Sequence, residues 1–133
     1  MTEPIGVLGI DHVQLAMPTG GEAAARRFYG QVLGLREVPK PDELVRRGGC
    51  WFVGPGGFAI HLGVDQRFMA AKKAHPCLIV VDIEAARRAV TAAGARIAGD
   101  DSDLLVRRFY VEDPFGNRIE LVEATDAGFT ERG

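Results

Sequence analysis

The chain has few cysteines and no long hydrophobic run. Its 133 residues include only Cys50 and Cys77, which lie in apolar, strand-like segments and do not form a C-x-x-C pair. A disulfide framework is therefore not expected. No run approaches the roughly 18 apolar residues of a membrane-spanning helix, and the first residues lack the basic and apolar regions of a secretory signal. These absences predict a cytoplasmic protein without a membrane partner.

Neither sign of charge dominates the sequence. The 16 basic residues and 18 acidic residues give a formal net charge of −2. This balance argues against nucleic acid or an anionic membrane as the main partner. The sequence also lacks G-x-G-x-x-G, a P-loop, G-x-S-x-G and H-E-x-x-H, so it gives no support to nucleotide binding or serine hydrolysis.

The sequence contains an internal repeat with a period near 60 residues. The strand-like segment IDHVQLAM precedes the helix-like EAAARRFYGQVLGL, and HPCLIVVD precedes EAARRAVTAAGARI. Further along, CWFVGPGGFAIHL and RFYVEDPFGNRIEL both read as strand, turn and strand. A duplicated βαβββ module gives such a pattern. We therefore expect an α+β fold in which two βαβββ modules form curled mixed sheets around a metal and substrate cavity.

One domain is expected over residues 1–133. Its parts are module one at about residues 8–64, a linker at about 65–74, module two at about 75–124 and a C-terminal tail at 125–133. Helices are expected over residues 20–33 and 83–93. Their ends carry capping and stop signals: Thr19 and Glu22 spaced as a capping box, Asp82 as an N-cap, and Gly34 and Gly94 as stops.

Four polar residues lie inside the strand-like segments: His12, His61, His75 and Glu120, which include all three histidines of the chain. An imidazole or carboxylate is unfavourable among apolar strand residues unless it is hydrogen-bonded or bound to something. Successive side chains of a strand point to opposite faces, so the apolar neighbours can pack on the helices while these four face away. The four also occupy the first and last strands of each module. The pattern predicts that curled sheets bring them together at one divalent metal ion.

Three imidazoles and one carboxylate form a ligand set suited to Zn²⁺, Ni²⁺, Fe²⁺, Co²⁺ or Mn²⁺. Four such ligands leave about two positions open on an octahedral ion. Without His61, the other three form a triad of two histidines and one carboxylate. Either arrangement leaves the open position that catalysis needs. In the alternative interpretation each histidine is a hydrogen-bonded sheet residue, and Glu120 pairs with Arg118 or another base.

Two motifs carry a family resemblance: FYGQVLGL at residues 28–35 and VEDPFGNRIELVE at residues 111–123. They resemble the vicinal oxygen chelate superfamily over roughly residues 8–124. This superfamily includes glyoxalase I, methylmalonyl-CoA epimerase, extradiol dioxygenases, fosfomycin-resistance thiol transferases and bleomycin-binding proteins. The resemblance implies a homodimer whose sites are shared between chains. One chain would supply His12 and His61, and the other His75 and Glu120.

The resemblance also implies roles for individual residues. Glu120, the only carboxylate among the proposed ligands, is the best candidate for a catalytic base. Tyr110 lies where fosfomycin enzymes have a substrate-contacting tyrosine, and Arg108 shares its strand face; a half-buried strand aromatic is the alternative for Tyr110. Gln14 would hydrogen-bond a metal-bound oxygen or sit at the cavity edge. Trp51 is expected to pack under a helix.

The resemblance implies a glyoxalase-like lyase or isomerase whose small substrate chelates the metal through neighbouring oxygens. Glyoxalase I usually has Glu at the position of His61 and the epimerase usually has Gln, so this chain departs from both. The enzyme alternatives are an Fe²⁺-dependent dioxygenase and a fosfomycin-type thiol transferase. A bleomycin-type drug-binding protein without turnover is the alternative from another class. Loops around residues 36–48 and 99–104 should line the cavity, and they carry no recognisable binding motif.

Overall fold

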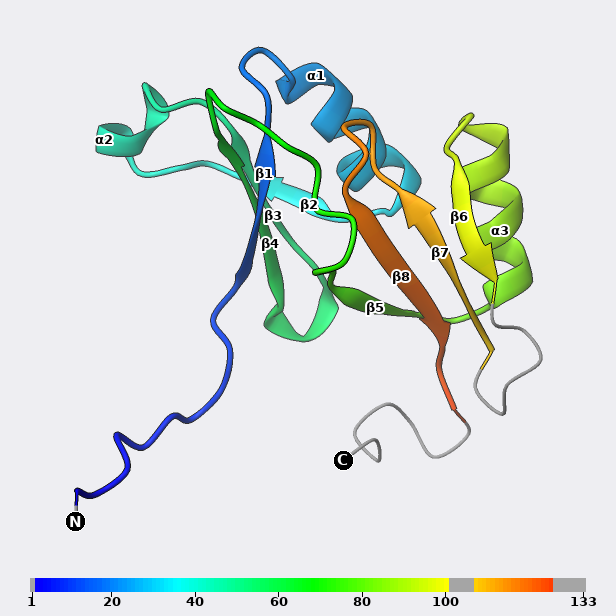
Figure 1. The fold of residues 1–133 in the computed structure, drawn as a ribbon, viewed down its shortest axis with the longest axis horizontal. Helices are drawn as coiled ribbons and strands as arrows, with labels where there is room; N and C mark the ends of the chain where they lie inside the picture. The colour runs from blue at the N-terminus through cyan, green and yellow to red at the C-terminus, as the bar shows by residue number, and fades with distance from the viewer. Residues whose placement is uncertain (1, 101–106, 126–133) are drawn as a thin grey trace.

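The computed structural model describes residues 2–100 and 107–125, which form two four-stranded sheets (Figure 1). The strand order is β1-β4-β3-β2 in the first sheet and β5-β8-β7-β6 in the second. The parallel pairs are β1 with β4 and β5 with β8, the first and last strands of each module in chain order. The other neighbouring strands are antiparallel. This repeated topology confirms the predicted α+β fold of two βαβββ modules. Among the described strands, both sheets remain open at their edges.

The first sheet contains β1 (Val13–Met17), β2 (Arg36–Val38), β3 (Cys50–Val53) and β4 (Ala59–Val64). The second contains β5 (Cys77–Val80), β6 (Ile97–Asp100), β7 (Arg108–Glu112) and β8 (Arg118–Glu123). The helical segments are α1 (Glu22–Ala25), the π-helical η1 (Arg26–Val32), α2 (Asp42–Val45), the 3₁₀ turn η2 (Pro55–Gly57) and α3 (Ile83–Ala92). No described helix is long and apolar enough to cross a membrane.

The structure describes all of one predicted cavity loop and part of the other. The loop at residues 36–48 contains β2 and α2. In the loop at 99–104, residues 99 and 100 belong to β6, and residues 101–104 lie outside the described residues. Residues 126–133 of the predicted tail also lie outside them.

The first predicted helix forms with a different geometry. After α1 the chain continues into η1, where the Leu33 N–H donates to the Phe28 carbonyl at 2.9 Å, a five-residue step typical of a π-helix. The predicted capping box is wrong, because the N-cap is Gly21 and no side chain caps the helix. The Glu22 carboxylate instead accepts a hydrogen bond of 2.7 Å from the Gly49 N–H. This bond lowers the pKa of Glu22 and ties the helix start to β3.

The second predicted helix agrees with its sequence signals. The Asp82 side chain accepts hydrogen bonds from the N–H groups of Glu84 and Ala85 at 3.0 and 3.1 Å. The bond from Ala85 is the main cause that lowers the pKa of Asp82. The helix ends at Ala92, and Gly94 takes the left-handed conformation at φ 77°. The N-cap and the stop are therefore confirmed for α3.

The core is one cluster of buried side chains that extends through both modules. Alternate residues of the strands contribute to it, so Leu15 and Met17 of β1 and Ile119 and Leu121 of β8 are buried. Helical residues fill the space against these strands; they are Ala25, Phe28, Tyr29, Ile83 and Val90. The predicted alternation is therefore confirmed for β1. In β8 Ile119 and Leu121 face the core as predicted, but Glu120 and Val122 on the opposite face are also buried.

Asp113, in the turn between β7 and β8, connects the two modules. Its Oδ2 accepts hydrogen bonds from the Tyr29 hydroxyl at 2.7 Å and from Asn117 Nδ2 at 3.0 Å. Its Oδ1 accepts from two backbone N–H groups of its own turn, each at 2.9 Å. The Asn117 side chain also donates to the Ala16 carbonyl and accepts from the Ala71 N–H. Burial, followed by the Asp113 charge, raises the pKa of Tyr29 well above its ordinary value.

Candidate functional site

His12 and His61 lie together on the helix-free face of the first sheet. His61 belongs to β4, and His12 directly precedes β1, the parallel neighbour of β4. Their imidazole centroids are 4.0 Å apart, and the ring planes differ by 18°. The His12 side chain is 38% exposed, and its Nδ1 lies 2.8 Å from the carboxylate of Asp11. The exposed His12 ring has room to turn, whereas the His61 ring is enclosed.

Trp51 extends this pair into a column of three rings. Its indole stacks on His61 with centroids 4.0 Å apart and planes within 4°. The prediction that Trp51 packs under a helix is wrong, because Cys50 and Phe52 are the buried residues of β3 and Trp51 faces the other side. Only 8% of His61 is exposed. Burial is the main cause that lowers the pKa of His61, and the neighbouring His12 lowers it further.

The fluorescence of Trp51 should report the protonation of His61, because Trp51 is the only tryptophan in the chain. A protonated imidazole in contact with indole quenches its emission. The lowered pKa keeps His61 neutral as the pH falls past 6.5, so the quenching midpoint should lie below 6.5. An emission titration from neutral to acidic pH measures it. His61→Gln should abolish the transition, and His12→Gln should move it to higher pH; a wild-type midpoint at or above 6.5 would contradict the stacked arrangement.

His75 and Glu120 form a second pair on the helix-free face of the second sheet. His75 Nε2 lies 3.0 Å from Glu120 Oε1, and His75 Nδ1 lies 2.8 Å from the Lys73 carbonyl oxygen. Since a carbonyl oxygen only accepts, Nδ1 carries a proton and Nε2 is directed at the carboxylate. Glu120 Oε2 lies 3.6 Å from a guanidinium nitrogen of Arg108. The Glu120 side chain, 10% exposed, is therefore held by a basic group at each oxygen.

Tyr110 packs against this second pair. It lies opposite Glu120 in the register of β7 and β8. Its ring meets the His75 ring edge-on, with centroids 5.6 Å apart. The guanidinium of Arg118, expected as an alternative ion partner of Glu120, instead lies 4.0 Å above the Tyr110 ring. The structure thus groups Arg108 and Tyr110, both predicted substrate contacts, with His75 and Glu120.

Gln14 lies with the first pair. It is exposed, faces His61 in the register of β1 and β4, and lines a depression of about 630 Å³ together with Asp65 and Arg67. A β-carbon added at Gly63 would lie 2.5 Å from Gln14 Nε2. The glycine therefore leaves room for the Gln14 amide beside His61.

Within one chain the four predicted ligands form two pairs in different sheets. Among residues 2–100 and 107–125, no group of three or more His, Cys, Asp or Glu side chains is arranged to hold an ion. Two atoms that bind one ion at about 2.1 Å are roughly 3 Å apart. The His75–Glu120 distance of 3.0 Å fits this requirement. The stacked rings of His12 and His61 fit it only after one ring turns, so the described part of one chain holds two separate candidate half-sites.

The chain is similar to one protein family and to several solved structures. The profile of the family described as Glyoxalase-like domain matches residues 14–122. A structure assigned to the glyoxalase family, from Bacillus anthracis, is 48% identical, covers 92% of this chain and 100% of its own, and has a TM-score of 0.83. No curated protein matches the chain.

Two more distant structures share the fold. A glyoxalase/dioxygenase from Nostoc punctiforme is 23% identical, with a TM-score of 0.76 and coverage of 95% of this chain and 97% of its own. The fosfomycin resistance protein FosX from Listeria monocytogenes is 13% identical, with a TM-score of 0.73 and coverage of 92% and 98%. At these identities the likeness is one of architecture.

Proposed function

Because this chain belongs to the glyoxalase-like domain family of the vicinal oxygen chelate superfamily, we propose that it is a metal-dependent lyase or isomerase of glyoxalase type. Its substrate is a small molecule that binds the metal through two neighbouring oxygens. The His75–Glu120 pair carries this proposal, with its 3.0 Å contact and the His75 Nδ1 proton on the Lys73 carbonyl. Metal-binding histidines commonly donate their other ring N–H to a carbonyl or carboxylate in this way.

A complete site combines the half-sites of two chains. His12 and His61 of one chain would bind the ion together with His75 and Glu120 of a second copy. The absence of a larger ligand group among the described residues of one chain supports this arrangement. Three or four protein ligands leave an open position for substrate. The proposed enzyme is accordingly a homodimer.

Glu120 is the proposed base. When bound, the ion would polarise the substrate oxygens and stabilise negative charge on them. Glu120 would detach from the ion and take up the substrate proton, while Arg108, 3.6 Å from Oε2, would keep the carboxylate oriented. Tyr110 beside His75 and Gln14 beside His61 would orient the substrate from opposite sides of the shared site.

We expect protein purified without chelator to contain one divalent ion per chain. Because histidine and carboxylate ligands bind a metal ion in their deprotonated forms, metal addition should release protons as well as heat. Elemental analysis gives the metal content, and calorimetry in two buffers measures the proton release. A drug-binding protein without turnover predicts less than about 0.1 ion per chain and no uptake of Zn²⁺, Ni²⁺ or Fe²⁺, which would contradict the proposal.

Glu120→Gln should lower kcat by about 10²- to 10⁴-fold on an identified substrate, because the amide cannot take up the proton. Steady-state turnover and metal content are measured on the same preparation. Glu112→Gln is the matched control, since Glu112 lies on β7 and contacts Lys72 and Arg96 instead of the metal ligands. Glu112→Gln should leave kcat unchanged. If Glu120→Gln keeps both its metal and full turnover, Glu120 is not the base.

A further inference from the structure

The chain between β4 and β5 contains neither a helix nor a strand. Residues 68–76 form its second part, which we call the connecting segment, and His75 lies near its end. Figure 1 shows this stretch in green between β4 and β5. Because the connecting segment has no helix or sheet of its own, individual hydrogen bonds and side-chain contacts determine its position. His75 therefore depends on these contacts, whereas its neighbour Glu120 lies within β8.

The turn between β7 and β8 binds the connecting segment. Asn117 Oδ1 accepts a hydrogen bond from the Ala71 N–H at 3.0 Å, and the Arg118 N–H donates to the Ala71 carbonyl at 2.9 Å. The Phe68 ring meets the Phe115 ring edge-on, with centroids 6.3 Å apart. Phe115 and Asn117 belong to the D-P-F-G-N run of the second family motif. This run therefore binds the connecting segment in addition to joining the modules.

Lys72 connects the segment to the glycine of the same run. Its Nζ donates to the Gly116 carbonyl at 2.9 Å and lies 3.4 Å from the Glu112 carboxylate. Gly116 takes the left-handed conformation at φ 90°, and a β-carbon there would lie 3.0 Å from Lys72 Nζ and 3.3 Å from the Ala70 β-carbon. Both the conformation and the limited space favour glycine. The motif glycine thus leaves room for the Lys72 ammonium group.

We propose that Lys72 is a positioning residue for the metal ligand His75. This inference rests on the proposed function, in which His75 Nε2 binds the ion. The carbonyl that holds the His75 ring belongs to Lys73, the residue next to Lys72, and lies 2.8 Å from Nδ1. By holding the connecting segment on the turn, Lys72 keeps this carbonyl in place and directs Nε2 toward Glu120, 3.0 Å away. Loss of such outer partners of a metal-binding histidine lowers metal affinity by about 10- to 100-fold.

A contribution to stability alone is the alternative role for Lys72. Its side chain is 62% exposed, and exposed ion pairs such as the one with Glu112 contribute little to stability. Glu112→Gln would also keep an oxygen that accepts a hydrogen bond from Lys72. A purely structural Lys72 predicts that its loss changes the thermal unfolding and leaves the Zn²⁺ affinity unchanged. A positioning residue predicts the reverse.

Lys72→Met tests the proposal, because it removes the ammonium group and keeps an unbranched side chain of similar length. We expect the dissociation constant for Zn²⁺, measured by isothermal titration calorimetry at one protein concentration, to increase about tenfold. The thermal unfolding of the metal-free protein should be unchanged. Lys72→Arg keeps a donor for the Gly116 carbonyl and should recover most of the affinity.

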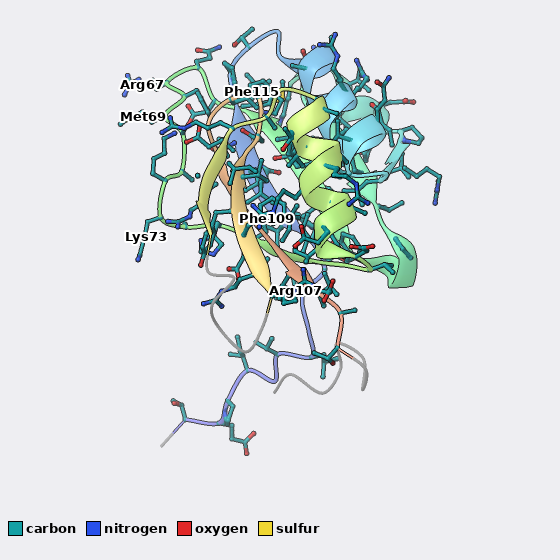
Figure 2. The ribbon with its side chains drawn as sticks, turned by 90° about the vertical axis from the view of Figure 1, so that its right-hand side faces the viewer. Arg67, Met69, Lys73, Arg107, Phe109 and Phe115 are labelled. Atoms are coloured by element: carbon teal, nitrogen blue, oxygen red, sulfur yellow. The ribbon has the colours of Figure 1, made fainter. Side chains whose placement is uncertain are left out.

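The matched control is Lys73→Met, which makes the same chemical change one residue further along. Figure 2 shows the Lys73 side chain pointing outward from the connecting segment. The substitution retains the Lys73 carbonyl, which is the group that contacts His75. It should therefore leave the Zn²⁺ affinity unchanged.

Amide hydrogen exchange in the metal-free protein tests the attachment of the connecting segment separately from metal binding. The Ala71 N–H is bound to Asn117 Oδ1 and exchanges when the connecting segment opens. It should exchange at least about tenfold faster in Lys72→Met than in the wild-type protein, and at the wild-type rate in Lys73→Met. Unchanged exchange in Lys72→Met would mean that Lys72 does not hold the segment, and the proposal would be overturned.

The metal measurements separate this proposal from the proposed function. If the wild-type protein binds Zn²⁺ and Lys72→Met binds it equally well, Lys72 is not a positioning residue and the proposed function stands. If the affinity falls only together with the thermal stability, or if Lys72→Arg does not recover it, the proposal is also overturned. If the wild-type protein binds no Zn²⁺, the proposed function fails and the positioning role fails with it.

Discussion

Asp113→Ala is expected to lower the free energy of unfolding by about 4 kcal/mol. Asp113 is 5% exposed and accepts four hydrogen bonds, which come from Tyr29, from Asn117 Nδ2 and from two N–H groups of its own turn. A hydrogen bond to a charged group contributes about 1.5–3 kcal/mol, although neighbouring bonds do not add fully. The substitution also leaves the buried Tyr29 hydroxyl without its acceptor. Because domains are stable by only about 5–15 kcal/mol, the loss is a large fraction of the total.

Thermal and urea unfolding measure this effect, and the melting temperature should fall by roughly 10–20 °C. Tyr29→Phe is the graded comparison, since it removes one of the four bonds and should cost about 1–3 kcal/mol. Asp82→Ala provides a control at an exposed carboxylate that accepts backbone hydrogen bonds, because it removes only the N-cap of α3 and should cost about 1 kcal/mol. If the free energy of unfolding of Asp113→Ala lies within about 1 kcal/mol of the wild-type value, the turn does not hold the modules together.

His61→Ala and His75→Ala should each weaken Zn²⁺ binding at least about 100-fold, although the two residues lie in different sheets. Each substitution would remove one donor of the proposed shared site, so the losses should be of similar size. Isothermal titration calorimetry measures the affinity. Cys77→Ser is the matched control, because Cys77 lies opposite Glu120 in the register of β5 and β8 and is not a proposed ligand. If His75→Ala reduces the affinity and neither His12→Ala nor His61→Ala does, the site does not combine both half-sites.

Strand alternation and the internal repeat were sufficient to predict the two sheets and their helix-free faces. The apolar residues of β1 and β8 face the core, as their alternate positions indicate, because a strand has only two faces. The same rule was available for β3. There Cys50 and Phe52 are buried, so Trp51 has to face the other side with His61.

Contacts between residues far apart in the sequence could not be predicted from local sequence patterns. Glu22 has the spacing of a capping box, yet it binds the backbone of Gly49, 27 residues away. Tyr29 and Asp113 were recognisable only as parts of two family motifs, and their hydrogen bond spans 84 residues. The partners of Glu22 and Tyr29 depend on how the modules pack. A side chain with the spacing of a local cap can instead form a more favourable hydrogen bond with a residue distant in the sequence. Tyr29 and Asp113 therefore mark the junction of the modules, whereas the candidate ligands, including Glu120 of the second motif, lie on the sheet faces away from the helices.

The sequence predicted which residues form the candidate site but not how one chain groups them. Strand alternation predicted His12, His61, His75 and Glu120 on helix-free strand faces. His61 lies in β4 and Glu120 in β8, whereas His12 and His75 lie just before β1 and β5, outside the strands. The structure separates the four into a histidine pair stacked on Trp51 and a His75–Glu120 pair held by Lys73 and Arg108. The relative position of two sheets is a property of packing, which periodicity within a strand does not describe.

Mixing two variants, each of which lacks one half of the proposed ligand set, tests the proposed shared site most directly. One variant carries His12→Ala and His61→Ala, and the other carries His75→Ala and Glu120→Ala, so each alone should bind no stoichiometric Zn²⁺. After subunit exchange, a mixed dimer contains one site without ligands and one site with all four. Zn²⁺ titration of the isolated mixed dimer should therefore find one ion per dimer. If wild-type protein binds Zn²⁺ and the mixed dimer binds none, each site lies within a single chain and the shared metal centre is wrong.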